Sequence, residues 1–388
     1  MINIVETLKT KTKIKVMGVG GAGGKSLNTM IPAEIEGVEY VAVNTDAQAL
    51  GCCTAREKIQ IGKNITDGLG AGGSPEKGKC AVEEDIELIK EALEDVRILF
   101  LTAGFGGGTG TGAAPVIARE AREQGLLTIA IVTKPFEFEG SFKMRVAEEG
   151  VRELKNAIDT VMIIPNQRLF EIAGDDMTMV DAFQQTDTTL TRSVQAISRL
   201  ILKPGMINLD FAHIQAVMSI KGSAMLGFGE GEGQGKAVHA MKEAISSPLI
   251  EAKELKGARG VLISLVCGED LMLTELNQAV EIVKQIAEPD ANIIFGANIE
   301  PEMEGRAAIT LIATGFESAG EKKNAALGKA IIKEKNDRVI DMFAEDPKKS
   351  GQSSLLIRGE QLIYRGENLE KPAFWRKKKE AKTTVFKD

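Results

Sequence analysis

Two glycine-rich segments carry the residue types that could cradle a chain of phosphate groups. Residues 18–24 read Gly-Val-Gly-Gly-Ala-Gly-Gly and contain the spacing G-x-G-x-x-G after an apolar run at 14–19. Without side chains, backbone N–H groups can approach phosphate oxygens, and the N-terminus of a following helix adds partial positive charge. Alone, this spacing is typical of dinucleotide-binding oxidoreductases and indicates the nucleotide only weakly.

The second segment, residues 104–112, favours a nucleoside triphosphate over a dinucleotide. It reads Gly-Phe-Gly-Gly-Gly-Thr-Gly-Thr-Gly, and its threonine hydroxyls can donate hydrogen bonds to phosphate. A dinucleotide enzyme needs no second cradle of this density, whereas a triphosphate must be wrapped from several sides. The sequence has no G-x-x-x-x-G-K-[ST] motif, which excludes a P-loop NTPase. The alternative is a glycine-rich turn that serves only close helix packing.

The elements predicted around these segments indicate an α/β fold. Apolar runs predict strands at 14–19, 38–43, 97–102 and 127–132, and helical patterns lie at about 24–31, 75–93 and 111–124. This alternation is typical of a doubly wound parallel sheet, which binds ligands at the carboxyl ends of its strands. Both glycine segments lie at that edge.

A second, smaller α/β unit is expected after a long helix at about 178–202, which Pro204 and Gly205 end. Its predicted helices lie at 236–246 and 274–287, and its strands at 259–266, 291–296 and 307–314. Beyond it we expect an amphipathic helix at 317–337, a polar linker at 345–370 and a basic end.

Composition excludes several classes of protein. The net charge of −7 argues against broad nucleic-acid binding, which needs a basic face. The four cysteines lack metal-ligand spacing and there are only two histidines, so we expect no zinc site. The sequence shows no secretory signal and no run of about 18 apolar residues. We therefore expect a cytoplasmic protein without an integral membrane segment.

Residues 106–112, Gly-Gly-Gly-Thr-Gly-Thr-Gly, resemble the signature loop of the tubulin/FtsZ family. Further segments resemble other loops of that family in the same order, at 18–24, 44–46, 68–75, 135–140, 165–166, 245–249 and 257–261. The resemblance covers roughly residues 12–316 and a short motif in the tail. Because the chain is shorter than eukaryotic tubulin and lacks a long acidic tail, it resembles the bacterial branch more closely.

The resemblance implies a GTP-dependent, polymerising cytoskeletal GTPase of the bacterial division ring, located in the cytoplasm at mid-cell. GTP would be hydrolysed to GDP at the junction between head-to-tail subunits of a filament. The implied organisation is a GTP-binding domain over 1–177, a central connecting helix over 178–203, a C-terminal domain carrying the hydrolysis loop over 204–317, a helix and polar linker over 318–370, and a basic C-terminal peptide over 371–388.

By the same resemblance, a set of small residues from several loops would bind the phosphates of GTP or GDP. These are Gly20, Gly21, Ala22, Gly23, Asn44, Ala71, Gly72, Gly104, Gly106, Gly107, Gly108, Thr109, Gly110, Thr111 and Gly112.

Four further residues would hold the sugar and the base. Glu139 would contact the ribose, Asn166 would lie near the guanine, and Phe183 would stack on it. Asp187 would accept hydrogen bonds from the ring N–H and the exocyclic amine of guanine, a pair of donors that adenine lacks. Taken singly, Phe183 fits a core residue and Asp187 a solvated charge. Lys143 stands where the family usually has arginine, which keeps the charge but loses the bidentate fork.

Residues 208–213, Asn-Leu-Asp-Phe-Ala-His, resemble the family's hydrolysis loop, whose pattern is Asn-x-Asp-x-x-Asp. That loop enters the nucleotide site of the next subunit, where Mg²⁺ or K⁺ would also lie. Asn208 and Asp210 match the pattern, but His213 replaces the second acid. A neutral imidazole cannot supply negative charge to a cation or an ordered water. Either hydrolysis is slow and the chain is mainly a GTP-binding filament protein, or His213 acts as the base, or Asp210 alone suffices.

The tail segment 369–376 resembles the family's C-terminal peptide, which docks on membrane tethers and division regulators. Pro372, Phe374, Trp375 and Arg376 would make those contacts. The basic run at 376–379 favours anionic lipid or acidic partners, or is a disordered end that keeps the chain soluble.

Overall fold

The structure is a computed structural model. It describes residues 13–158, 160–168, 177–202, 205–207, 211–247 and 257–316, together with the backbone of three short strands nearer the C-terminus. The chain divides into two compact units, Met1–Lys322 and Lys323–Asp388. In the second unit, β11 (Leu355–Arg358), β12 (Gln361–Tyr364) and β13 (Glu367–Asn368) form an antiparallel sheet. These strands lie within the region for which the sequence predicts a polar linker.

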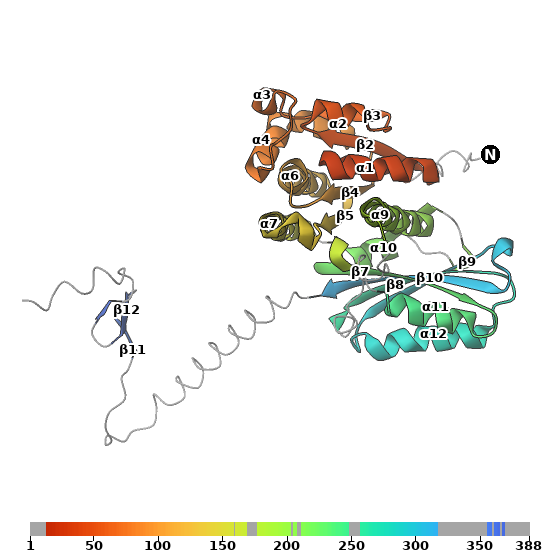
Figure 1. Ribbon diagram of the computed structural model, residues 1–388. Helices are drawn as coiled ribbons and strands as arrows, with labels where there is room; N and C mark the ends of the chain where they lie inside the picture. The colour runs from red at the N-terminus through yellow and green to blue at the C-terminus, as the bar shows by residue number, and fades with distance from the viewer. Residues whose placement is uncertain are drawn as a thin grey trace, which may run out of the picture. The chain divides into compact units, whose positions relative to one another are not determined.

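The first unit is built on a ten-stranded sheet in the order β3-β2-β1-β4-β5-β6-β7-β10-β8-β9 (Figure 1). All pairs from β3 to β7 are parallel, β10 is antiparallel to both of its neighbours, and β8 is parallel to β9. The strands are β1 (Ile14–Val19), β2 (Val38–Asn44), β3 (Glu57–Gln60), β4 (Ile98–Gly104), β5 (Leu127–Lys134), β6 (Thr160–Pro165), β7 (Gly222–Glu232), β8 (Gly260–Cys267), β9 (Asn292–Ile299) and β10 (Arg306–Phe316). The predicted doubly wound parallel sheet is confirmed.

Helices lie on both faces of the sheet (Figure 1). They are α1 (Gly20–Met30), α2 (Ala47–Gly51), α3 (Lys63–Thr66), α4 (Pro75–Glu84), α5 (Ile86–Ala92), α6 (Thr109–Glu123), α7 (Ser141–Ala157) and α9 (Met179–Leu202), followed by α10 (Phe211–Met218), α11 (Lys236–Ile245) and α12 (Leu273–Ile286). Short 3₁₀ turns are η1 (Ile31–Ala33), η2 (Glu137–Glu139) and η4 (Pro301–Met303). No helix among the described residues is both long and apolar enough to cross a bilayer.

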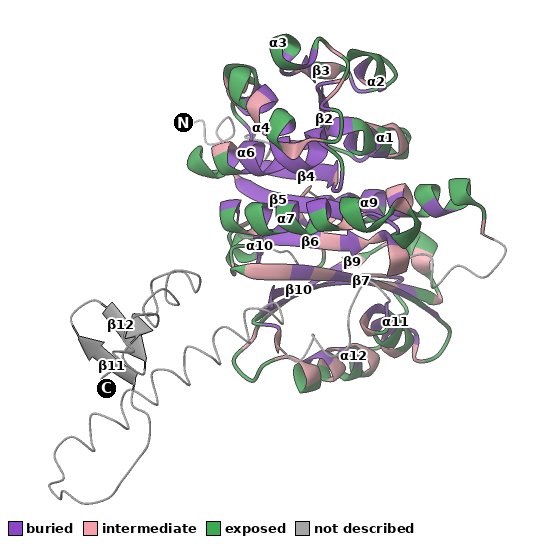
Figure 2. Ribbon diagram, turned by 60° about the vertical axis from the view of Figure 1, so that its left-hand side comes forward, coloured by how far each residue is buried: buried purple, intermediate pink, exposed green. Residues whose placement is uncertain are grey.

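Neighbouring residues of β1 enter two different cores, because side chains alternate along a strand. Val16 packs with α1 and α9 residues such as Leu27 and Val194, whereas Met17 packs with α6 residues such as Ile117. Burial on both faces explains why these strands read as continuous apolar runs. Figure 2 shows the result as a band of buried residues through β4 and β5. The α9 core continues into β7, β8 and β10, so one apolar cluster joins both halves of the sheet.

Two helix predictions differ from the structure, and several elements, among them β7, were not predicted. The first helix begins at Gly20, within the glycine segment, rather than at about residue 24. The single helix expected at 75–93 is interrupted at Asp85, whose carboxylate accepts a hydrogen bond from Gly62 N at 2.7 Å. Strand β7 was not predicted, because its glycines weaken the strand pattern. A Cβ at Gly229 would collide with the Ala240 carbonyl of α11, so glycine lets that helix lie directly on the strand.

Candidate functional site

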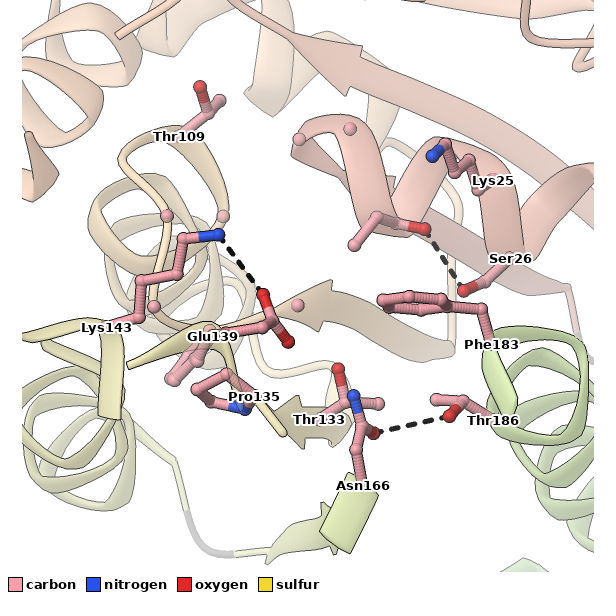
Figure 3. Close-up of a pocket in the computed structure, with 18 of the residues that line it drawn as sticks. Lys25, Ser26, Thr109, Thr133, Pro135, Glu139, Lys143, Asn166, Phe183 and Thr186 are labelled. Carbon is pink, nitrogen blue, oxygen red and sulfur yellow. Dashed lines mark hydrogen bonds and ion pairs between the residues drawn. The ribbon is translucent and has the colours of Figure 1, made fainter. Parts of the chain in front are cut away.

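A cavity of about 430 Å³ opens at the carboxyl ends of β1, β4 and β5, the edge predicted from the strand order (Figure 3). Its lining comes from α1, the loop into α6, the segment after β5, and α9. Fourteen of the residues predicted from the sequence line it: Gly20, Gly21, Ala22, Gly104, Gly106, Gly107, Gly108, Thr109, Gly110, Glu139, Lys143, Asn166, Phe183 and Asp187.

Two helix N-termini meet at this cavity. Helix α1 begins at Gly20 and α6 at Thr109, and neither has a side-chain N-cap or an acidic residue in its first turn. Their first backbone N–H groups therefore keep donor capacity, and both helix dipoles present positive charge. A Cβ at Gly20 would lie 2.9 Å from Gly110 N, which shows how closely the two turns approach. This arrangement suits an anion with several oxygens, such as a polyphosphate.

The glycines of the cavity fall into two groups. A Cβ at Gly104 would lie 2.5 Å from the Ala22 Cβ, so packing demands glycine there, and Gly20 has φ +75°. In contrast, a Cβ at Gly21 or Gly107 would meet no protein atom within 4 Å, although both residues line the cavity. Protein packing does not require glycine at these two positions. Close approach of a ligand to the backbone explains them better.

The end of the cavity formed by α9 carries an acid and an aromatic ring. The Asp187 Oδ1 accepts a hydrogen bond from Ser26 Oγ at 2.6 Å. Burial raises the pKa of the Asp187 carboxyl, while the Ser26 hydrogen bond and the charge of Lys25 act in the opposite direction. The Phe183 ring is 40% exposed and meets the buried Phe136 edge-on, with centroids 5.2 Å apart. A half-exposed ring one helical turn from a carboxylate can stack on a base whose polar edge the acid accepts.

A second acid and a lysine lie on the opposite side (Figure 3). The Glu139 Oε1 accepts a hydrogen bond from Phe136 N at 3.0 Å, and Glu139 Oε2 lies 3.1 Å from Lys143 Nζ. Asn166 is buried, and its Oδ1 lies 3.4 Å from Thr186 Oγ1. The cavity thus combines cationic and N–H donor groups for phosphates with acceptors for hydroxyl and amine groups.

Comparison with known proteins gives the family. A family model described as Tubulin/FtsZ family, GTPase domain, matches residues 13–174, and one described as FtsZ family, C-terminal domain, matches residues 222–317. The cell division protein FtsZ of Coxiella burnetii is 45% identical over 347 residues, which are 89% of this chain and 90% of that protein. The chain belongs to the tubulin/FtsZ family.

Other relatives agree. The cell division protein FtsZ of Bartonella bacilliformis is 44% identical over 365 residues, or 93% of this chain, and the chain spans 61% of the length of that relative. An empty FtsZ dimer from M. jannaschii matches with a TM-score of 0.74 at 42% identity, covering 81% of this chain and 90% of that one. The resemblance in the sequence to the tubulin/FtsZ family, and to its bacterial branch, is therefore confirmed.

Six predicted phosphate contacts of this tubulin/FtsZ-family chain do not line the cavity: Gly23, Asn44, Ala71, Gly72, Thr111 and Gly112. Several support the loops instead. The Thr111 Oγ1 accepts a hydrogen bond from Gly106 N at 2.9 Å, and Asn44 Oδ1 accepts one from Asp46 N at 3.2 Å. A Cβ at Gly112 would collide with the Pro75 carbonyl of α4. Asn44, Thr111 and Gly112 thus have structural roles in or beside the glycine loops.

Seven lining residues were not among the predicted contacts: Lys25, Ser26, Phe105, Thr133, Pro135, Thr186 and Leu190. Leu190 could have been found, because it follows Phe183 and Asp187 at seven and three residues on one helix face. Lys25 and Ser26 lie in the first turns of α1, which the sequence prediction began too late.

The predicted hydrolysis residues lie apart from the cavity or outside the described part of the chain. His213 is exposed, is the third residue of α10 and does not line the cavity. Asn208 and Asp210 fall outside the described residues, as do the helix expected at 317–337 and the tail residues Pro372, Phe374, Trp375 and Arg376. Within the described ranges, no group of three or more His, Cys, Asp or Glu side chains could hold a metal ion.

Proposed function

We propose that this chain binds GTP or GDP in the cavity and hydrolyses GTP at the junction between head-to-tail subunits, as the filament-forming GTPase of the bacterial division ring, in the cytoplasm at mid-cell. The observation that carries the proposal is the convergence of two uncapped helix N-termini on a cavity that also holds Phe183 and Asp187. The matching family model is a GTPase domain, and the relatives are named cell division protein FtsZ.

In this proposal each side of the cavity binds a different part of the nucleotide. The first turns of α1 and α6, with Thr109, bind the phosphates through N–H groups and positive helix ends. Glu139 accepts from the ribose hydroxyls and Lys143 adds charge beside them. At the α9 side, Phe183 stacks on guanine and Asp187 accepts its two neighbouring donors. Because adenine presents no such pair, the carboxylate selects GTP over ATP.

Hydrolysis requires a second subunit in this proposal. The carboxylates that line the described cavity, Glu139 and Asp187, are assigned to the ribose and the base in this proposal, and the exposed His213 does not line the cavity. Asn208, Asp210 and His213 of one subunit would reach the cavity of the next, where Mg²⁺ or K⁺ balances the phosphate charge. A dimer is the form in which the M. jannaschii relative was solved. The tail residues Pro372, Phe374, Trp375 and Arg376 would bind membrane tethers and division regulators.

A second candidate is a GTP-binding filament protein that hydrolyses little GTP. The observation that favours it is His213 itself, an exposed imidazole where the hydrolysis loop of the family carries an acid. In this version the filament forms on GTP binding and is long-lived.

The test is GTP turnover together with filament pelleting, both followed as a function of protein concentration. Turnover that rises steeply above the concentration at which the protein begins to pellet supports an assembly-activated GTPase. Pelleting with little turnover supports the second candidate. Binding of NAD in preference to GTP and ATP, without pelleting, would overturn both.

A further inference from the structure

Ser26 connects α1 to the carboxylate at the α9 side of the cavity. The serine is 2% exposed, and its Oγ lies 2.6 Å from Asp187 Oδ1, although 161 residues separate the two. A hydroxyl has one proton, and the competing acceptor, the Ala22 carbonyl, is farther away at 3.1 Å. The shorter bond to the charged acceptor is the stronger one. The Ser26 hydroxyl therefore donates its hydrogen bond to Asp187 rather than to the Ala22 carbonyl.

This bond fixes a group that would otherwise rotate. The terminal torsion of an aspartate is broad, so a carboxylate without a partner samples many orientations. A carboxylate has about four lone-pair sites, which leaves acceptor capacity on both oxygens after Ser26 has donated to Oδ1. Since Asp187 and Ser26 both line the cavity, the remaining lone pairs are available to a ligand there.

We propose that Ser26 is a positioning residue for guanine recognition, holding the Asp187 carboxylate in the orientation in which both oxygens accept the N1–H and the 2-amino group of guanine. The inference rests on the proposed binding of GTP and deepens it. Ser26 itself need not touch the nucleotide. Its effect reaches the base through Asp187.

Removal of the Ser26 hydroxyl should weaken the binding of a base that gives Asp187 two donors, such as guanine, more than the binding of a base that gives it one. We expect Ser26→Ala to weaken GTP binding about tenfold, the scale of one hydrogen bond to a charged group. Inosine triphosphate lacks the 2-amino group, so its affinity should fall less and the preference for GTP over inosine triphosphate should shrink. Ser26→Thr keeps the hydroxyl and should restore much of that preference.

The pH dependence of GTP binding gives an independent readout. The Ser26 hydrogen bond and the Lys25 charge oppose the effect of burial on the pKa of Asp187. Without the hydroxyl the pKa of Asp187 rises further. As the pH is lowered, the carboxylate of the variant therefore takes up a proton earlier, and its GTP affinity begins to fall at a higher pH than that of the original chain. The other charged residues of the cavity, Lys25, Glu139 and Lys143, are the same in both proteins. The difference between the two profiles therefore reports on Asp187.

The experiment compares GTP and inosine triphosphate affinities and thermal unfolding for the full chain and its variants, at concentrations too low for pelleting. Ser193→Ala is the matched control, because Ser193 is a fully buried α9 serine outside the cavity whose hydroxyl donates to Thr189 O at 2.7 Å. Ser26→Cys, a near isostere with a weak donor, replaces Ser26→Ala if that variant does not fold. Equal losses for both nucleotides, or an unchanged GTP affinity, would overturn the positioning role. A wild-type chain that does not bind GTP would instead overturn the proposed function.

Discussion

The Lys143 ammonium is held 3.1 Å from Glu139 Oε2, while the other oxygen of Glu139 accepts the Phe136 N–H at 3.0 Å. Both oxygens of the carboxylate are thus engaged, and the one cationic group that lines this side of the described cavity is paired with it. The pair is half-exposed on the lysine side, so it contributes little to the stability of the fold. We propose that Lys143 is shared between Glu139 and a phosphate of the bound nucleotide.

Lys143→Arg should strengthen triphosphate binding. A guanidinium can pair with Glu139 through one N–H and reach a phosphate oxygen through another, which an ammonium does less well. We expect GTP affinity to rise about three- to tenfold, and GDP affinity to rise less, because charge-assisted bidentate bonds are the stronger ones. Equilibrium binding of the two nucleotides measures this. Lys155→Arg on the same helix is the control, and an unchanged affinity for GTP would mean that residue 143 does not reach the phosphates.

Asp187→Asn should change which base is accepted. The amide keeps an acceptor for the ring N–H but presents an NH₂ group where the 2-amino group of guanine needs an acceptor. GTP affinity should fall about tenfold to a hundredfold, since a donor then faces a donor. Xanthosine triphosphate carries an oxygen at that position and should bind better to the variant than to the original chain. Competition between the two nucleotides tests the assignment, which fails if xanthosine triphosphate gains nothing.

His213→Asp should accelerate hydrolysis if the second candidate function is right. A carboxylate restores the negative charge that orients water and cations at the subunit junction, and a well-placed base is worth about a hundredfold or more. A rise in turnover of about tenfold or more per pelleted subunit is expected. His213→Asn separates the alternatives, because a histidine that acts as the base gives a step in the pH profile that this variant abolishes. Little change in either variant would mean that Asp210 suffices.

Gly112→Ala and Gly21→Ala should affect different properties, the first the stability of the fold and the second the binding of GTP. A Cβ at Gly112 collides with the backbone of α4, and overpacking of this kind costs about 1–3 kcal/mol of unfolding free energy. A Cβ at Gly21 meets no protein atom within 4 Å but lies at the cavity. We therefore expect Gly112→Ala to lower the melting temperature, and Gly21→Ala to keep it while weakening GTP binding. Thermal unfolding and GTP titration of both variants check this, and a normal GTP affinity in Gly21→Ala would contradict the phosphate assignment.

The sequence predicted the parts of the site that local rules determine. Strands such as 14–19 and 97–102 are buried on both faces, so their apolar runs are visible without tertiary information. The glycines of 104–110 line the cavity because they form the turn into α6, again a local property. Strand β7 could not be predicted in this way, since Gly229 and Gly231 are explained only by helix α11, which packs on them.

Contacts between residues far apart in the sequence could not be predicted from the sequence pattern. Nothing in the periodicity of α1 or α9 indicates that Ser26 faces Asp187, because the contact depends on how the two helices cross the sheet. The same holds for Gly112, which reads as one more phosphate glycine but packs against α4. Residue type predicted which segments form the cavity, and tertiary packing decided which residues of each segment line it.

The side of the cavity that we propose for the phosphates is built from the first turns of two helices, and most of its donors are main-chain N–H groups. An alanine scan exchanges side chains only, so it would leave these N–H groups in place and underestimate their share of the binding energy. Replacing an amide with an ester linkage in the first turn of α1 or α6 removes a donor without altering any side chain. Such backbone editing is the experiment to which this half of the cavity should respond, whereas a side-chain substitution can weaken it only by blocking the ligand, as we expect at Gly21, or by changing the path of the chain.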